Sequence, residues 1–381
     1  MNIGTICFYY PHLGGSGIIA SRIAKEIALQ SKNNSIIISY ENTENPKEME
    51  EAGIKLYTAQ DVSYGCLKSK PHIETLVSKT LEAIKKENLD LIHSHYLVPH
   101  AIVGNIVKQI EGIPHITTIH GTDMHTLADN PGLKPILEWS LKNANYVTFV
   151  SEYLKNKCES IFETDFNGKV IPNFVDNNIF KKQKNGLRKE LNIPEDATVI
   201  IHASNFRPIK NTIPIGWAAR KLIENNKEHQ IYFIFVGDSN AEDYLRLKKD
   251  IEYSNSSKYF KFLIKQDTIA PLLAESDIAI LNSTREGCPL FILEALSSNI
   301  PVVSSSVGGV PEIIKHNYNG LLYEKGNQDE MVKALQTLVE NRELRRKMGE
   351  RGLETIIEKF SKEKIMNDYK EIYQKIINQQ K

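Results

Sequence analysis

The stretch IAILNSTREGCPLFILEALSSNIPVVSS, residues 278–305, contains one complete strand–helix–strand unit. Its β-branched runs at 278–282 and 302–305 predict two strands, and the apolar residues after Pro289 predict a helix between them. Proline suits the first turn of a helix, because the amide hydrogen that it lacks would be unpaired there anyway. A strand, a crossover helix and a second strand in this order are typical of a parallel sheet.

The same alternation extends along the chain in two successive series. Strands are predicted at 3–8, 35–39, 91–95, 115–120 and 146–150, and again at 199–203, 232–236, 260–264, 278–282 and 302–305. Helices are predicted at 16–30, 73–87, 99–110 and 151–161 in the first series, and after residues 211, 241, 268, 289 and 328 in the second. Two such series predict an α/β protein of two doubly wound, Rossmann-like domains whose strand carboxyl ends face each other across a cleft.

The turn-forming segment IPNFVD, residues 171–176, predicts the boundary between these domains. We therefore expect an N-terminal domain at 1–172, a C-terminal domain at 173–355 and a last helix at 356–381 that packs back on the first domain. The charged end of the chain carries an apolar stripe that requires a packing partner, formed by Leu353, Ile356, Ile357 and Phe360.

Composition excludes several classes of protein. The 47 basic residues equal the 47 acidic ones, which argues against a general nucleic-acid binder because such a protein needs excess positive charge. Four scattered cysteines, Cys7, Cys66, Cys158 and Cys288, form no CxxC pair and fit a reduced, cytoplasmic protein. The chain starts without a basic leader, and no apolar run approaches the roughly 18 residues that cross a bilayer, so we expect no signal peptide and no transmembrane segment.

Two carboxylates, Glu286 and Glu294, follow the strand at 278–282. Glu286 falls in the strand-to-helix loop, and Glu294 about a turn and a half into the helix. Free amides at a helix start can receive phosphate oxygens, and neighbouring carboxylates can accept hydrogen bonds from sugar hydroxyls. On spacing alone, a pair of ordinary surface glutamates near a helix start explains the pattern equally well.

A basic loop, HASNFRPIK at 202–210, follows the first strand of the second series. Arg207 and Lys210 could flank a diphosphate there and neutralise the charge that grows as it leaves. The alternative is two solvated cations.

A glycine-rich turn, GGSG at 14–17, follows the first strand of the chain. Glycines let a ligand approach the backbone closely, and the following helix start favours an anion. The turn is neither a GxGxxG fingerprint nor a P-loop, and the alternative is a tight turn with Ser16 as the helix cap.

Six histidines fall between residues 93 and 125 and suggest a metal site. However, His93 and His95 share one strand face, and no acidic or thiol partner stands at ligand spacing, so we expect no metal. We expect His95 and His120 at neighbouring strand ends, as hydrogen-bond donors in the cleft.

Taken in order, GGSG, HGTD, IPNFVD, the Arg207/Lys210 loop, the Glu-x7-Glu pair and SSSVGGVPEII (304–314) resemble the retaining, GT-B-fold glycosyltransferases of family 4 over most of the chain. Further stretches resemble the members that transfer N-acetylglucosamine to L-malate in bacillithiol biosynthesis. These are GGSGIIA (14–20), LDLIHSHYLVPHA (89–101), TTIHGTD (117–123), SNFRPIK (204–210) and KQD (265–267).

The resemblance implies a UDP-hexose donor, a small hydroxylated acceptor, no cofactor and a chain that can form a homo-oligomer. The catalytic set that it implies is His120 near the reacting sugar, Arg207 and Lys210 on the diphosphate, and Glu286 on the sugar. It further implies donor contacts from Gly15, Ser16, Asn205, Gln266, Gly287, Cys288, Pro289, Leu290 and the ribose-binding Glu294, and acceptor contacts from Ser16, His95, Tyr96 and Thr122.

Two departures from the family pattern stand out, the first at the expected diphosphate-binding cation and the second in a segment expected on the acceptor side, which leaves the acceptor open. Asn205 stands where many members carry an arginine, and residues 60–72 lack the tyrosine- and proline-rich stretch of the malate-using members. A saccharide, lipid or cyclitol acceptor is therefore an alternative, as are an epimerase of the same architecture and a catalytically silent nucleotide-sugar-binding protein.

Overall fold

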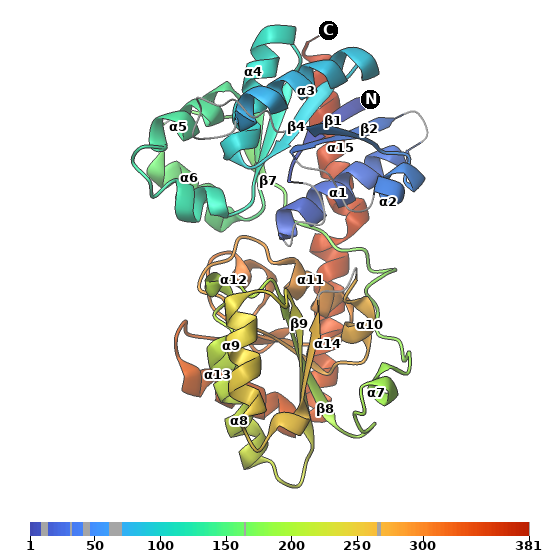
Figure 1. Ribbon diagram of the computed structural model, residues 1–381, viewed down its shortest axis with the longest axis vertical. Coiled ribbons are helices and arrows are strands. Elements are labelled where there is room, and N and C mark those ends of the chain that lie inside the picture. Colours follow the sequence, from blue (N-terminus) through green and yellow to red (C-terminus); the bar gives the residue numbers. More distant parts are fainter. Residues whose placement is uncertain are drawn as a thin grey trace. The chain divides into compact units, whose positions relative to one another are not determined.

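A computed structural model describes residues 1–8, 14–30, 33–40, 46–60, 71–163, 165–264 and 268–380, without the side chains of 46–48. The chain forms two compact units (Figure 1). The first consists of Met1–Pro172 together with Ile365–Lys381, and the second of Asn173–Lys364. Each unit has one parallel sheet with crossover helices, which confirms the predicted α/β class.

The first unit is built on a seven-stranded sheet in the order β3-β2-β1-β4-β5-β6-β7. The strands are β1 (Asn2–Ile6), β2 (Asn34–Tyr40), β3 (Lys55–Ala59), β4 (Leu91–His95), β5 (His115–Ile119), β6 (Tyr146–Phe149) and β7 (Gly168–Val170). The helices are α1 (Gly15–Ala28), α2 (Pro46–Glu51), α3 (His72–Glu87), α4 (Ile102–Glu111), α5 (Lys134–Asn143) and α6 (Glu152–Ile161), with two π-helical turns, η1 (Leu97–Ala101) and η2 (Asp123–Leu127). Strands β4 and β5 are buried along their whole length, as expected for central parallel strands.

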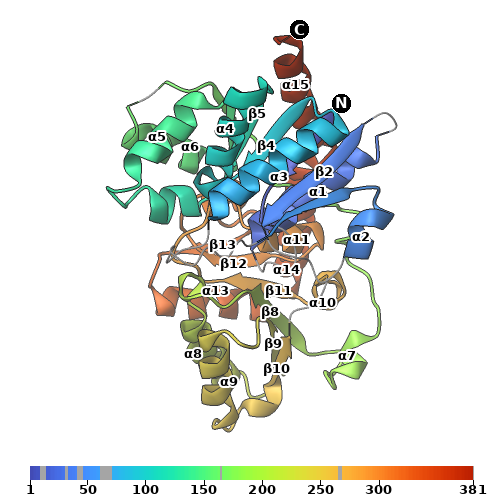
Figure 2. The same ribbon diagram turned by 45° about the horizontal axis from the view of Figure 1, so that its top comes forward.

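The second unit is built on a six-stranded sheet in the order β10-β9-β8-β11-β12-β13, of which Figure 2 shows β11, β12 and β13 side by side. The strands are β8 (Thr198–Ser204), β9 (Ile231–Gly237), β10 (Phe260–Ile264), β11 (Ile278–Leu281), β12 (Val302–Ser305) and β13 (Gly320–Tyr323). The helices are α7 (Leu187–Glu190), α8 (Ile213–Asn225), α9 (Glu242–Glu252), α10 (Ala270–Ala274), α11 (Leu290–Ser297), α12 (Val310–Ile313), α13 (Gln328–Glu340) and α14 (Arg342–Thr355). Short turns lie at η3 (Pro208–Lys210), η4 (Ser257–Tyr259) and η5 (Ile356–Phe360).

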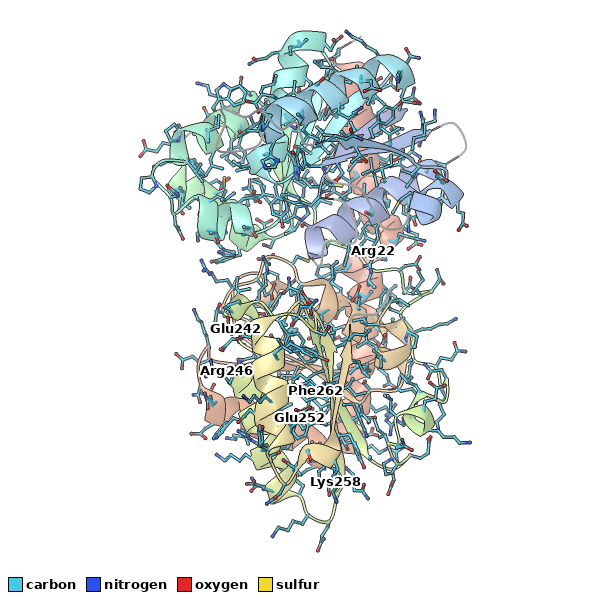
Figure 3. All side chains as sticks on the ribbon, in the orientation of Figure 1. Arg22, Glu242, Arg246, Glu252, Lys258 and Phe262 are labelled. Atoms are coloured by element: carbon cyan, nitrogen blue, oxygen red, sulfur yellow. The ribbon has the colours of Figure 1, made fainter. Side chains whose placement is uncertain are left out.

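Helix α9 shows how an amphipathic sequence selects the face that packs. Tyr244 and Leu247 are buried in the core of the second unit. Glu242, Arg246 and Glu252, labelled in Figure 3, are exposed on the opposite side of the helix. The apolar and charged positions therefore separate with the helical period.

Both sheets reverse their strand order once, at β1–β4 in the first unit and at β8–β11 in the second. Loops that leave the carboxyl ends of the two strands at such a point run in opposite directions and leave room for a ligand. The glycine-rich turn follows β1, and the basic loop follows β8. The sequence motifs thus fall at the two positions where doubly wound sheets bind ligands.

The end of the chain differs from its predicted boundary. Helix α15 (Lys362–Asn378) joins the first unit only from Ile365, whereas the predicted segment began at 356. Ile356 and Phe360 are buried in the second unit instead. Ile357, assigned to the same stripe, is 52% exposed, because η5 has a π-helical winding that shifts the buried face.

The sequence pattern missed two edge strands, β3 and β13, which are only five and four residues long. Strand β3 is mostly half-buried, so it lacks the continuous apolar run that marks a central strand. None of the helices in the described residues is long and apolar enough to cross a membrane.

Candidate active site

The basic loop and the Glu-x7-Glu segment meet at the carboxyl end of the second unit's sheet. Lys210 Nζ lies 2.6 Å from Glu286 Oε1, and the two side chains are only 19% and 10% exposed. Both residues follow the strands of the switch point, Lys210 after β8 and Glu286 after β11. The folded chain therefore holds a cation and a carboxylate in direct contact where a ligand is expected.

The backbone of the basic loop is fixed by hydrogen bonds to the segment after β11. Thr284 N donates to Ile209 O at 2.8 Å, and Asn282 Nδ2 donates to Asn211 O at 2.8 Å. The loop places Lys210 beside Glu286 through these bonds, so their contact does not depend on the ion pair alone.

Phe206 anchors the start of the same loop. Its side chain is 1% exposed and its backbone is left-handed, with φ of +51°. The ring packs directly over Gly237, where an added Cβ would lie 2.4 Å from the phenyl ring. With Phe206 pointing inward, the next residue, Arg207, is exposed. Asn205 supports this turn, since its Oδ1 accepts from Arg207 N at 3.4 Å.

The VGG sequence after β12, residues 307–309, packs against the backbone of Glu286. Gly308 has φ of +54°, and an added Cβ would lie 2.0 Å from the carbonyl oxygen of Glu286. Gly309 N donates to that same oxygen at 3.2 Å. Only glycine at 308 permits this approach, so the motif 304–314 sets the position of Glu286.

The start of α11 contains the remaining predicted donor contacts. Gly287, Cys288, Pro289 and Leu290 are buried, and Asn173 Nδ2 donates to Cys288 O at 2.7 Å. Pro289 precedes the helix as its N-cap residue, with an extended backbone, one position earlier than predicted. Glu294 lies on the fifth residue of the helix and is 6% exposed. The helix start thus combines free amides with a buried carboxylate.

In the first unit, the glycine-rich turn contacts the loop after β4. Ser16 Oγ donates to Tyr96 OH at 2.8 Å, and Tyr96 has an unusual φ of +82°. Helix α1 is capped by Gly14, and its N-cap makes no side-chain hydrogen bond, so Ser16 is not the cap. Gly15 is exposed beside it. These residues line the carboxyl ends of β1 and β4.

The predicted pair of histidines is brought together. His95 ends β4, His120 follows β5, and His95 Nδ1 lies 2.8 Å from His120 Nε2. Burial lowers the pKa of His120 to about 3 and the pKa of His95 well below its usual value. Both rings are therefore neutral at physiological pH and act through hydrogen bonds. His95 itself is fully buried.

Asp123 belongs to the candidate site by its contacts, and the sequence analysis did not select it. Its Oδ1 accepts from Leu97 N at 2.8 Å, and its Oδ2 accepts from His120 N at 3.1 Å. Burial raises the pKa of this carboxyl to about 6. Asp123 ties the loop after β5 to the loop after β4, while Thr122 beside it is exposed. The available signal was the carboxylate three residues after His120.

Two predictions about this site need separate mention. Gln266 lies outside the described residues, together with Lys265 and Asp267. No group of three or more His, Cys, Asp or Glu side chains that could hold a metal ion occurs in the part of the chain that the structure describes.

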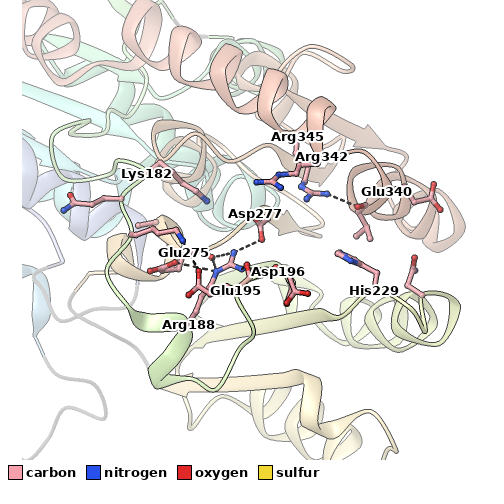
Figure 4. A pocket seen from close by; sticks show the side chains of 16 residues that line it. Lys182, Arg188, Glu195, Asp196, His229, Glu275, Asp277, Glu340, Arg342 and Arg345 are labelled. Carbon is pink, nitrogen blue, oxygen red and sulfur yellow. Dashed lines mark hydrogen bonds and ion pairs between the residues drawn. The ribbon is translucent and has the colours of Figure 1, made fainter.

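A hollow of about 850 Å³ lies at the opposite, amino edge of the second unit's sheet (Figure 4). Its wall includes Arg188, whose guanidinium donates to the carbonyl of Glu275 at 2.8 Å and to Asp277 Oδ2 at 2.9 Å. Its basic and acidic lining residues balance, and none of the predicted site residues that the structure describes lines it. Arg188 ties the segment before β8 to the turn before β11, which is a structural role.

Comparison with known proteins identifies what the chain resembles. The sequence model of "Glycosyltransferase Family 4" matches residues 13–178, and that of "Glycosyl transferases group 1" matches residues 183–355. N-acetyl-alpha-D-glucosaminyl L-malate synthase of Bacillus anthracis is 32% identical over 100% of this chain and 98% of its own length. UDP-Gal:alpha-D-GlcNAc-diphosphoundecaprenol alpha-1,3-galactosyltransferase of Escherichia coli is 27% identical over 75% of this chain and 73% of its own length.

Solved structures resemble the whole chain. Anabaena HepE in complex with UDP-glucose superposes with a TM-score of 0.82 at 21% identity, over 98% of this chain and 100% of that one. Sucrose-phosphate synthase from Thermosynechococcus elongatus gives a TM-score of 0.82 at 17% identity, over 99% of both chains.

Proposed function

Because the chain belongs to the glycosyltransferases of group 1 and family 4 and has their GT-B fold, we propose that it is a retaining hexosyltransferase. The donor in this proposal is UDP-N-acetylglucosamine, and the acceptor is the hydroxyl group of L-malate. The observation that supports a nucleotide-sugar donor is the contact of Lys210 with Glu286. The observation that supports L-malate as the acceptor is the full-length similarity to the malate synthase.

The Lys210–Glu286 contact explains how a diphosphate sugar is received. An arriving β-phosphate offers Lys210 an anionic partner, and Glu286 then becomes free to accept hydrogen bonds from sugar hydroxyls. Arg207, exposed on the same loop, supplies a second cation. Glu294 accepts from the ribose hydroxyls, and the amides at the start of α11 receive phosphate oxygens. These are the donor-binding roles that we propose.

The proposed transfer keeps the α configuration at C1. The bond from C1 to the β-phosphate oxygen breaks with its electron pair on the phosphate, through an oxocarbenium-like state. The acceptor oxygen then forms its bond to C1 on the same face, and its proton passes to the departing phosphate. Lys210 and Arg207 stabilise the charge on the diphosphate, which is where most of the rate enhancement arises. His120 donates a hydrogen bond to the sugar.

The acceptor side in this proposal is the carboxyl edge of β1 and β4. Hydroxyl groups are supplied there by Ser16, Tyr96 and Thr122. His95 is hydrogen-bonded to His120 and fixes its position. Hydroxyl and imidazole groups suit a small hydroxy acid. The similarity to the undecaprenol-dependent galactosyltransferase over three quarters of the chain favours a second candidate, transfer to a lipid-linked saccharide.

Mass spectrometry of the products tests both candidates. The purified chain is offered UDP-N-acetylglucosamine with L-malate in one reaction and with a lipid-linked N-acetylglucosamine acceptor in another, each with and without EDTA. We expect N-acetylglucosaminyl malate in the first reaction, with the small anomeric coupling of an α-glycoside in its proton NMR spectrum. Product in the second reaction alone would show that the acceptor is a lipid-linked saccharide and not L-malate. A β-glycoside would contradict the proposed retention of the α configuration. Loss of product with EDTA would contradict the expectation that no metal is needed.

A further inference from the structure

A tyrosine of the last helix, α15, contacts one of the buried histidines of the candidate site in the first unit. Tyr373, on α15, is 1% exposed, and its hydroxyl lies 2.8 Å from Nδ1 of the fully buried His93. An ion pair between Lys169 and Asp368, at 2.6 Å, holds the same helix to β7. The side chain of Tyr373 is therefore fixed against the sheet by packing and by a buried polar contact.

The direction of this hydrogen bond follows from the partners of His93. The pKa of His93 falls to about 3 through burial, so the ring is neutral and carries one N–H. Its Nε2 lies 2.7 Å from Thr118 Oγ1, which lies 2.6 Å from Thr148 Oγ1. The Tyr373 hydroxyl has no other acceptor among the described residues, so it donates to Nδ1, and Nε2–H donates to Thr118. Tyr373 thus selects the tautomer of His93.

His93 in turn supports the two histidines of the site. Its ring packs against that of His95, with centroids 4.3 Å apart, and His95 meets His120 edge to edge, with centroids 5.1 Å apart. His95 Nδ1 and His120 Nε2 share a hydrogen bond of 2.8 Å. A shift of the His93 ring would therefore move His95, and with it the orientation of His120.

The proton in the His95–His120 bond can also be placed. His95 Nε2 is buried and has no partner among the described residues. A buried N–H without an acceptor is rarer than a buried acceptor without a donor, so His95 carries its proton on Nδ1 and donates to His120 Nε2. His120 then holds its own proton on Nδ1, where it can donate to a ligand. The His95–His120 hydrogen bond thus orients a hydrogen-bond donor towards the ligand.

We propose that Tyr373 is a positioning residue for sugar transfer, acting through His93 and His95 on the orientation of His120. The inference rests on the proposed function, in which His120 contacts the transferred sugar. Tyr373 touches neither donor nor acceptor in this scheme. Its effect should therefore appear in kcat and depend on the presence of the His120 side chain.

The first test is kinetic and uses the full-length chain with UDP-N-acetylglucosamine and the acceptor that gives product. Tyr373→Phe should lower kcat about fivefold, the rate equivalent of one neutral hydrogen bond, without changing KM for the donor. The matched control is Tyr57→Phe, which removes a tyrosine hydroxyl bond of 2.7 Å to Glu87 in the same unit and should keep the kcat of the wild type. In a His120→Ala background, Tyr373→Phe should cause no further loss.

Equal losses in both backgrounds would assign Tyr373 a general structural role and overturn the inference, as would a kcat equal to that of Tyr57→Phe. A wild-type chain without transferase activity would instead count against the proposed function, and the inference would fall with it. The two failures are therefore distinguishable.

The second test needs no substrate. Long-range ¹H–¹⁵N NMR spectra report which ring nitrogen of each histidine carries the proton. We expect His93 protonated on Nε2 and His95 on Nδ1 in the wild type, and a mixture of His93 tautomers in Tyr373→Phe. An unchanged His93 signal in that variant would refute the tautomer assignment and the inference.

Discussion

Replacement of Lys210 by alanine tests the central contact of the candidate site. Lys210 Nζ lies 2.6 Å from Glu286 Oε1, in a pair whose side chains are 19% and 10% exposed. If Lys210 stabilises the leaving diphosphate as we propose, its removal should lower kcat about 10²- to 10³-fold, equivalent to about 3–4 kcal/mol. The assay is release of UDP coupled to mass spectrometry of the product.

The same change should also destabilise the fold, because Glu286 loses its partner. Exposed pairs contribute about 0–1 kcal/mol, and breaking a fully buried pair costs about 3–5 kcal/mol. This pair is intermediate, so we expect a loss of about 1–2 kcal/mol in urea unfolding. Adding Glu286→Gln should recover part of the stability but none of the turnover.

The control for Lys210→Ala is Lys221→Ala. Lys221 pairs with Asp329 at 3.2 Å in the same unit, but the two side chains are 42% and 86% exposed. Its removal should leave turnover and unfolding unchanged. A Lys210→Ala protein that is folded and turns over at the wild-type rate would refute the assignment of Lys210 to the diphosphate.

Three further predictions concern the glycine support, the ribose site and acid stability. Gly308→Ala places a Cβ 2.0 Å from the carbonyl oxygen of Glu286. It should lower kcat, and it should lower the free energy of unfolding by about 1–3 kcal/mol. Gly326→Ala has a similar positive φ but no neighbour within 4 Å, so in urea unfolding it should cost less and leave kcat intact. Glu294→Ala should weaken UDP binding about tenfold in calorimetry, with a smaller change in kcat, and unchanged affinity would exclude the ribose contact. Burial lowers the pKa of imidazoles such as His93, in that case to about 3. Each such group adds stability that is fully present above pH 6.5, the ordinary pKa of histidine, and that is lost as the pH falls from there towards the lowered pKa. Because several such imidazoles oppose the raised pKa of Asp123, the unfolding midpoint in urea should drop between pH 7 and pH 5, and a constant midpoint would contradict this.

The alternation of strands and helices was predictable because it depends on local periodicity. The positions of the loops after β8 and β11 were also predictable, because they follow strands with continuous apolar runs. The short strands β3 and β13 were not, since neither has the length or the pattern to separate it from a loop.

The supporting contacts of the site could not be read from the sequence. Tyr373 and His93 are 280 residues apart, and no local pattern indicates that they meet. The left-handed backbone of Phe206 is unexpected for an aromatic residue and depends on the space that Gly237 leaves. Such contacts depend on tertiary packing, which overrides local preference.

Helix α15 has a consequence for how the protein is made. It completes the first unit, but it is synthesised after the whole second unit. While the nascent chain grows on the ribosome, the face of β4 that carries His93 lacks its cover, and the first unit cannot finish folding before the second has emerged. Expression of residues 1–172 alone should therefore give an aggregation-prone product, whereas supplying α15 by a circular permutation that joins it to Met1 should give a soluble one.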